Sequence, residues 1–539
     1  MKKSLIALLL ITLLIPFVAS AQNPRLVVGI VVDQMRYDYL SRFTGKYGNG
    51  GFKRLLSEGF DCRNAQYNYV PTFTGPGHAS IYTGTTPAIH GIAANEWYDK
   101  RTRRSAYCTY DKSVQPVGTT NESGLMSPTN LDATTIGDEL EVATNTKAKV
   151  IGVSLKDRAS ILPAGHAADA AYWLDGSSGN FITSTFYRKD LPGWLLEFNS
   201  KKLPTHYLKF GWNTILPIEK YTESLPDDNP YEKAGGMKSK PVFPYDFKEQ
   251  LAKGSFEVLK STPYGNDVTK DLAIAAIEGE GLGMDSICDM LCVSFSSTDY
   301  IGHAFGPKSV ELEDAYIRLD KSIEELLAHL DNKVGKGNYT LFLTADHGVS
   351  EVPSYLQSLK INAGYADPKT IAKKLKGTLY KEYGDSLVME YVNQQVYLND
   401  SIIYLKKLDK LAVEHFCAKV LMKNSEVSSV TLGEDISLQS QPDILFKGLI
   451  QRGYHSKRSG DVLVTYKPGF MEHEITGTTH GTPFSYDTHV PLLFYGKGIN
   501  TGSTLRAVSI TDIASTICQL LNIPYPNGNI GNPISEVLK

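Results

Sequence analysis

The sequence has few cysteines and, beyond its N-terminus, no apolar run long enough to cross a bilayer. Six cysteines in 539 residues are too few for a disulfide scaffold, and no Cys-x-x-Cys pair offers thiolates to a metal. The formal charge is only −3, and no basic stripe with interleaved aromatic residues occurs. Nucleic acid is therefore excluded as a backbone-bound partner. Any bound metal must be held by histidine and carboxylate ligands.

The N-terminus predicts a secretory signal peptide over residues 1–21. Lys2 and Lys3 precede an apolar run over 5–18, and Ala19-Ser20-Ala21 supplies the small residues that cleavage requires. No cysteine follows to carry a lipid, so we expect a periplasmic or secreted protein with no membrane contact after signal cleavage. A retained N-terminal anchor is the alternative. Cleavage would remove two lysines and change the formal charge from −3 to −5.

The mature chain, 22–539, alternates strand-like and helix-like segments, which predicts an α/β fold. Residues 308–330 form the clearest helix, with one apolar face. Continuous apolar runs predict buried strands at 25–32, 147–154, 290–295, 340–344 and 489–495. We expect one large catalytic domain with a mainly parallel central sheet between helical layers. Two stretches without this alternation, approximately 165–265 and 351–470, are predicted to be inserted lid or side segments.

Residues 71–80, Pro-Thr-Phe-Thr-Gly-Pro-Gly-His-Ala-Ser, predict a tight bend at the start of a helix. Gly75 and Gly77 permit close backbone approach, and a helix N-terminus favours an anion. Thr74 precedes the bend, where its hydroxyl suits a nucleophile below a phosphate or sulfate. The alternative is an N-capping threonine in an ordinary turn.

Three predicted strands end in carboxylates, and histidines lie close to them in the sequence. The residues concerned are Asp33, Asp299, Asp346, His303, His347 and His480. A mixture of His and Asp with an open position suits zinc better than calcium or magnesium, which prefer oxygen ligands. Six ligands make two three-ligand sites, and Thr74 can complete one of them while water or substrate completes the other. For Asp33, capping of the next helix is the alternative.

Lys156-Asp157-Arg158 follows another predicted strand, 147–154. Two cations at the carboxyl end of a strand can clamp a phosphate, whereas the alternative is a solvated turn. For His78 the sequence leaves two interpretations: the side chain orients the Thr74 turn, or it is simply a buried structural residue. His489, which lies next to the His480 loop, is open between a metal ligand and a structural residue.

These residues together resemble the alkaline phosphatase superfamily. The resemblance rests on Asp33, Thr-Phe-Thr74-Gly-Pro-Gly-His, Asp299-x-x-x-His303, Asp346-His347-Gly348 and Gly-Thr-Thr-His480-Gly, in an order that covers the whole mature chain. Within the superfamily, Asn95 and Ser-Leu-Lys156-Asp-Arg158 are similar to the PafA-type monomeric alkaline phosphatases.

The resemblance implies the role of each residue. It places Asp299, His303 and His480 on one zinc ion, and Asp33, Asp346 and His347 on a second zinc ion beside Thr74. It implies that Thr74 is the nucleophile and that Asn95, Lys156 and Arg158 hold the phosphoryl oxygens. It further implies a monomer that hydrolyses small phosphate monoesters through a phosphothreonine and releases inorganic phosphate.

Related activities differ at the nucleophile or the cations. Sulfatases of the superfamily need Cys or Ser followed by x-Pro-x-Arg, whereas Gly-Pro-Gly-His follows Thr74. Cofactor-independent phosphoglycerate mutases resemble the same ligand set but place a serine at the nucleophile. Phosphodiesterases and nucleotide pyrophosphatases share the threonine and the two-zinc ligands, and they are the alternative function; we do not expect the Lys156-x-Arg158 pair in them. A non-catalytic exported zinc- or phosphate-binding protein is the third hypothesis.

Overall fold

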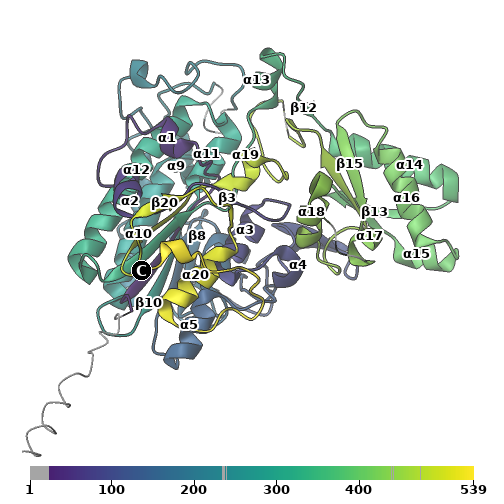
Figure 1. Cartoon of the computed structure of the whole chain (residues 1–539). Coiled ribbons are helices and arrows are strands. Elements are labelled where there is room, and N and C mark those ends of the chain that lie inside the picture. Colours follow the sequence, from purple (N-terminus) through teal and green to yellow (C-terminus); the bar gives the residue numbers. More distant parts are fainter. Residues whose placement is uncertain (1–22, 234–236, 238–239, 439, 441, 474) are drawn as a thin grey trace, which may run out of the picture.

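A computed structural model describes residues 23–539 except 234–236, 238–239, 439, 441 and 474 (Figure 1). The predicted signal peptide lies outside the described residues. Strand β1 (Leu26–Val32) runs through the middle of a ten-stranded sheet and is completely buried. It pairs in parallel with β10 (Asp289–Phe295) and β11 (Tyr339–Thr344), and β10 pairs in parallel with β7 (Val150–Ser154).

The outer strands make the sheet mixed. Antiparallel β19 (Leu492–Gly496) joins β11 on one side, and β8 (Ala170–Asp175) and β9 (Asn180–Ser184) extend the sheet beyond β7 on the other. The strand order is β20-β2-β19-β11-β1-β10-β7-β8-β9-β6, where β20 is Gly502–Thr504, β2 is Phe60–Cys62 and β6 is Pro116–Val117. The expectation of a mainly parallel central sheet is therefore confirmed, because β11, β1, β10, β7 and β8 pair in parallel. Antiparallel pairs flank this centre on both sides, and the outermost pair of β2 with β20 is again parallel.

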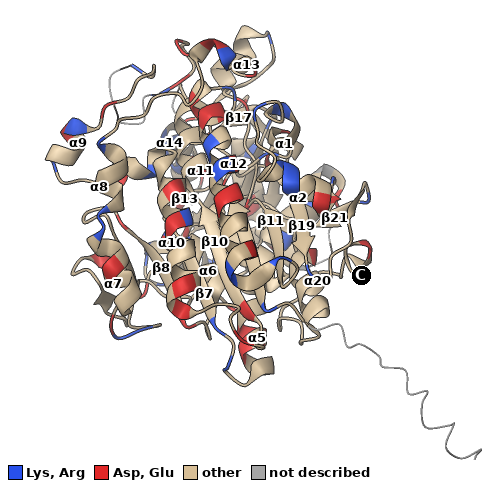
Figure 2. Cartoon of the chain, turned by 90° about the vertical axis from the view of Figure 1, so that its left-hand side faces the viewer, with Lys and Arg blue, Asp and Glu red and all other residues tan. Residues whose placement is uncertain are grey.

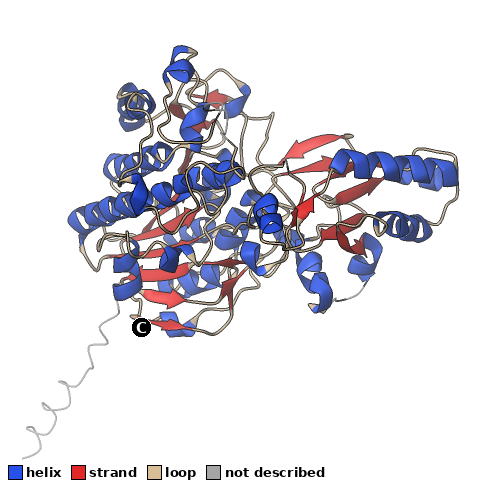
Figure 3. Ribbon diagram, turned by 90° about the horizontal axis from the view of Figure 1, so that it is seen from above, coloured by secondary structure: helices blue, strands red, loops and turns tan. Residues whose placement is uncertain are grey.

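Helices cover both faces of this sheet (Figure 3). On one face α10 (Tyr264–Glu280) packs on β10 and β7, and α12 (Val310–Leu330) packs against α10. The other face carries α3 (Thr74–Thr83), α5 (Ile136–Thr144), α6 (Asp157–Ala164) and α20 (Asp512–Leu521), which contact one another. In Figure 2 acidic and basic residues are interspersed along the outer helices. The apolar face of α12 is buried as predicted, including Leu319, Ile323 and Leu326.

The segment 351–470 contains a second sheet with its own core, which we call the small lobe (Figure 1). Its strands lie in the order β13 (Val388–Val392), β14 (Gln395–Leu398), β16 (Val462–Tyr466) and β15 (Val427–Leu432), all antiparallel. Helices α14 (Pro368–Tyr383) and α16 (Lys410–Leu421) pack on it.

The expected insertion at 165–265 is only partly separate from the sheet. Because β8 and β9 belong to the central sheet, residues 170–184 are core rather than lid, and this part of the prediction is wrong. The described part of the remainder includes the short helices α7 (Gly193–Ser200), α8 (Leu203–Leu208) and α9 (Lys248–Ala252).

All six cysteines are buried free thiols, so no disulfide bond contributes to this fold. None of the helices in the described part of the chain has the length and apolarity that crossing a bilayer requires.

Candidate metal centre and phosphate site

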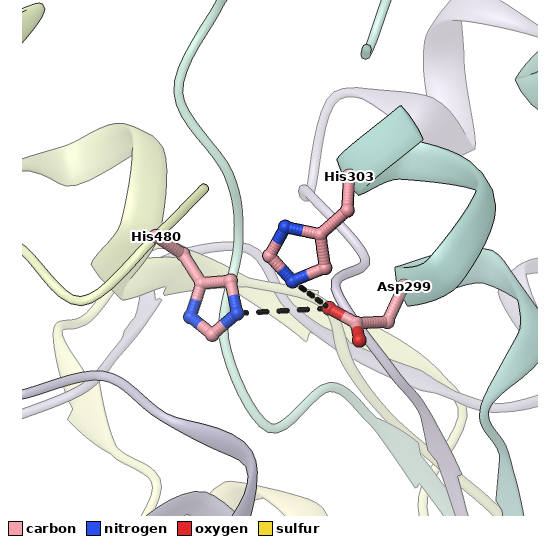
Figure 4. Close-up of side chains that lie close together, drawn as sticks. All are labelled: Asp299, His303 and His480. Carbon is pink, nitrogen blue, oxygen red and sulfur yellow. Dashed lines mark ion pairs between the residues drawn. The ribbon is translucent and has the colours of Figure 1, made fainter. Parts of the chain in front are cut away.

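The first group of metal-ligating side chains comes from one helix and one loop (Figure 4). Asp299 and His303 are one turn apart on α11 (Ser297–Phe305), so both project from the same face. The loop carrying His480 approaches this face, and these three residues form a group that could hold a metal ion. His303 Nε2 is 3.1 Å and His480 Nε2 is 3.6 Å from Asp299 Oδ1.

The other ring nitrogen of each histidine contacts a backbone carbonyl. His303 Nδ1 lies 2.8 Å from Thr478 O, and His480 Nδ1 lies 2.7 Å from Thr72 O. A carbonyl only accepts, so each Nδ1 carries the proton and each Nε2 presents a lone pair beside Asp299. Burial lowers the pKa of His480 well below its usual value, which favours the neutral ligand form. This arrangement is typical of zinc-bound histidine.

The second group consists of Asp33 after β1 and Asp346 and His347 after β11. His347 Nε2 is 3.5 Å from Asp33 Oδ1 and 3.5 Å from Asp346 Oδ2. These three atoms are buried and have no hydrogen-bond partner. His347 Nδ1 contacts Gly348 O at 3.0 Å, and burial lowers the pKa of His347 to about 3. Three buried atoms that converge without hydrogen-bond partners fit a cation site, and a set of two carboxylate oxygens and one imidazole nitrogen fits zinc.

The two groups are in direct contact. The rings of His347 and His480 stack with centroids 3.5 Å apart, and Asp299 is also close enough to Asp33 and His347 to share an ion with them. Burial and the neighbouring Asp299 raise the pKa of Asp33 to about 6. Such closely spaced buried carboxylates need positive charge nearby.

Thr74 begins α3, whose Gly77 and His78 lie against Asp346 of the second group. The N-cap position belongs to Phe73, and the start of α3 has no side-chain cap hydrogen bond, so the interpretation of Thr74 as an N-cap is wrong. Thr74 is 1 % exposed. A Cβ atom at Gly77 would lie 2.4 Å from Asp346 O, so only glycine allows the helix to approach the second group this closely.

The three side chains predicted to bind phosphate are those of Asn95, Lys156 and Arg158. Asn95 Oδ1 accepts a 2.7 Å hydrogen bond from Gly75 N–H. The amino group of Asn95 therefore points away from Gly75 N–H. Lys156 follows β7, and its Nζ lies 2.6 Å from both Asp33 Oδ2 and Asp299 Oδ2. With its side chain only 1 % exposed, Lys156 is not part of a solvated turn, so that alternative is wrong.

Arg158 is positioned by a residue that the sequence did not single out. Its Nη1 donates to the Tyr107 hydroxyl at 2.9 Å, while its buried Nε has no partner. Tyr107 ends β5 (Arg104–Tyr107), which pairs with β4 (Glu96–Asp99) in a hairpin that begins just after Asn95. Only the paired strands bring Tyr107 to Arg158.

Gln34 is a second residue that sequence reasoning missed. Its Nε2 donates to Asp299 Oδ1 at 2.7 Å, and its backbone N–H donates to Asp346 Oδ1 at 3.1 Å. Gln34 thereby orients one carboxylate of each metal group. It adopts a left-handed backbone conformation, φ 66°, which is uncommon outside glycine and is a signal only the structure can provide.

The two histidines whose roles the sequence left open, His78 and His489, lie in different environments. His78 is buried and faces the Thr74 turn, with Nδ1 2.9 Å from Thr74 O, which supports the orienting role. His489 stacks on Tyr37 and contacts Arg63 O with Nε2 at 2.9 Å, so it is structural rather than a metal ligand.

Comparisons with known proteins cover nearly the whole chain. Residues 27–486 match the family model described as type I phosphodiesterase / nucleotide pyrophosphatase. The chain is 45% identical over 522 residues to alkaline phosphatase PafA of Elizabethkingia meningoseptica, covering 96% of this chain and 95% of that one. It is 47% identical over 523 residues to a protein of Myroides odoratus named calcium-transporting ATPase, covering 96% and 95%. A crystal structure of wild-type alkaline phosphatase PafA matches with a TM-score of 0.93 at 45% identity, over 96% of this chain and 99% of that chain.

Proposed function

Because the chain belongs to the type I phosphodiesterase / nucleotide pyrophosphatase family and matches an alkaline phosphatase along nearly its whole length, we propose that it is an exported phosphomonoesterase that uses two zinc ions and Thr74. Its substrates are small phosphate monoesters, and it acts as a monomer. Export is supported by the basic and apolar N-terminal residues 1–21.

The proposed ligands of one zinc ion are Asp299, His303 and His480, and those of the other are Asp33, Asp346 and His347. Zinc bound there lowers the pKa of an adjacent hydroxyl and offsets the charge on a leaving oxygen. The second site is supported by three buried atoms that have no hydrogen-bond partner: Asp33 Oδ1, Asp346 Oδ2 and His347 Nε2.

Thr74 supplies the nucleophile in this proposal. Its oxygen attacks phosphorus in line, the ester oxygen leaves as the alcohol, and water then hydrolyses the phosphothreonine to inorganic phosphate. Burial of Thr74 at the N-terminus of α3 excludes bulk water and places the helix dipole towards the anion. Asn95, Lys156 and Arg158 bind the phosphoryl oxygens that do not react.

The observation that carries the choice of a monoester is the buried charge of Lys156 beside both metal groups. Two Zn²⁺, three aspartates, a Thr74 alkoxide and the cations Lys156 and Arg158 leave a net charge of about +2, which matches a dianionic monoester. The terminal phosphoryl group of ATP has the same three free oxygens, so an ATPase name for one relative is compatible with this chemistry.

A phosphodiesterase is the second candidate, because the matching family model carries that description. The two functions differ in the charge on the third phosphoryl oxygen. The test is the rate on an aryl phosphate monoester and on its methyl aryl diester, with zinc replete and after chelation. We expect fast, zinc-dependent monoester hydrolysis. Faster hydrolysis of the diester, or monoester turnover that survives complete removal of zinc, would contradict the proposal.

A further inference from the structure

A row of buried polar side chains lies under the site, where β7 and β10 end. We propose that these side chains form one hydrogen-bonded chain that positions the proposed nucleophile relative to the phosphate-binding cations; this inference rests on the function proposed above. We call it the buried serine–histidine chain. Its members are Ser154, Ser296, Ser294 and His78, and its two ends are the backbone atoms Lys156 N and Thr74 O.

One half of the chain starts at β7. Lys156 N–H donates to Ser154 Oγ at 3.2 Å, and Ser154 Oγ lies 2.9 Å from Ser296 Oγ. Both serine side chains are completely buried. Lys156 is the N-cap residue of α6, so this contact holds the backbone from which the first turn of α6, with Arg158, begins.

The other half starts at the nucleophile. His78 Nδ1 is 2.9 Å from Thr74 O, one turn earlier on α3, and His78 Nε2 is 2.9 Å from Ser294 Oγ. Ser294 Oγ is 3.5 Å from Ser296 Oγ, which is the weakest link. Ser294 and Ser154 are register partners on the parallel strands β10 and β7, so the sheet itself sets their separation.

The two ends determine the direction of every link. A backbone N–H only donates, and a carbonyl only accepts. His78 Nδ1 must therefore carry the ring proton, and His78 Nε2 must accept from Ser294. Ser294 spends its only proton on His78 Nε2, so Ser296 must be the donor in the link to Ser294. The proton of Ser296 is then used as well, so Ser154 donates to Ser296 while it accepts from Lys156 N–H. All donors in the chain point towards Thr74, and aligned bonds in a buried site polarise one another.

This geometry connects the N-termini of two helices that pack against each other, α3 with Thr74 and α6 with Lys156 and Arg158. A misplacement of reacting groups by a fraction of an ångström is costly in phosphoryl transfer, where catalysis depends on position. Ser154, Ser294, Ser296 and His78 are therefore positioning residues, and none of them needs to touch the substrate.

The test uses the zinc-loaded, full-length mature enzyme and an aryl phosphate monoester. We expect Ser294→Ala and Ser154→Ala each to lower kcat on the order of 10-fold, with little change in KM, because each removal breaks a buried bond and leaves a partner unsatisfied. Ser294→Cys keeps the side-chain shape with a slightly larger and weaker donor, and it should act in the same direction. Zinc content should remain that of the wild type.

Ser80→Ala is the matched control. Ser80 is equally buried on α3, and its Oγ lies 2.9 Å from His90 Nε2, outside the chain. We expect this variant to lose thermal stability to a similar degree but to change kcat by less than about twofold.

The decisive measurement is a double-mutant cycle with both cations. If Ser154 acts by positioning Lys156 and Arg158, Ser154→Ala should change kcat by less than about twofold in a Lys156→Ala/Arg158→Ala background. A full loss in that background, or serine variants no slower than Ser80→Ala, would overturn the proposal. A wild-type enzyme that does not hydrolyse the monoester would instead contradict the proposed function, so the two failures are distinguishable.

Discussion

Replacement of Lys156 and Arg158 by alanine tests the discrimination between monoester and diester most directly. Lys156 offers a point charge, and Arg158 a planar fork whose Nη1 is held by Tyr107 at 2.9 Å. A hydrogen bond to a charged group contributes roughly 1.5–3 kcal/mol. Loss of either side chain should therefore lower monoester kcat/KM roughly 10- to 100-fold.

Loss of both should cost more than either single change but less than the product, because the two cations share one phosphoryl group. Diester turnover should fall much less, since one of the contacted oxygens is esterified and carries no charge. Zinc should be retained, because removal of an ammonium 2.6 Å from Asp33 and Asp299 does not weaken the attraction of these carboxylates for a metal.

The assay is steady-state kcat/KM for both substrates, together with zinc analysis of every variant. Lys270→Ala is the control, because Lys270 on α10 is another largely buried lysine, paired with Asp271 at 2.6 Å and with Glu325 of α12 at 2.7 Å. It should leave both rates unchanged. Equal losses on monoester and diester in the Lys156 and Arg158 variants would mean that the pair supports the fold or the metals, and the reasoning would be refuted.

Three further predictions follow from the site and the core. Thr74→Ala should abolish turnover and retain most zinc, whereas Thr74→Ser should keep substantial activity; a phosphopeptide from acid-quenched enzyme that lacks Thr74 would disprove its role. Asp346→Ala and His303→Ala should each lower zinc content and activity together, and one metal ion or none in active enzyme would rule out the two-metal site. Leu326→Ala, in the core face of α12, should cost about 2–5 kcal/mol of stability and leave kcat unchanged, which thermal denaturation and kinetics on the folded protein can check.

Much of the central sheet was predictable because its strands are buried on both faces. Fully buried parallel strands read as continuous apolar runs, and 290–295 and 340–344 fall within β10 and β11. The helix predicted at 308–330 is α12, because its apolar residues repeat with the helical period. The edges were less predictable, since β8 and β9 follow one another in a stretch of mixed composition and are recognised as sheet only by their pairing.

The candidate site likewise contains residues that the sequence indicates and residues that only the structure reveals. Thr74 and the three aspartates stand out in the sequence because each follows a strand or opens a helix, whereas His303 lies inside α11 and His480 lies in a loop. Gln34 and Tyr107 do not stand out, because a glutamine after an aspartate and a tyrosine in a short polar strand have no distinctive local pattern. Their roles depend on φ at residue 34 and on the pairing of β5 with β4.

The sequence by itself determined which chemical groups are present and at which strand ends they lie, because hydrophobic periodicity and turn residues act over a few neighbouring positions. Only the tertiary structure decided that Asp33, Asp299 and Asp346 share one buried site, although 313 positions separate the first from the last. Within this site Lys156 lies between Asp33 and Asp299. Strand order decides this, since β7, β10, β1 and β11 are neighbours in the sheet but not in the chain. Proximity of that kind is a property of the packed sheet, and no local segment encodes it.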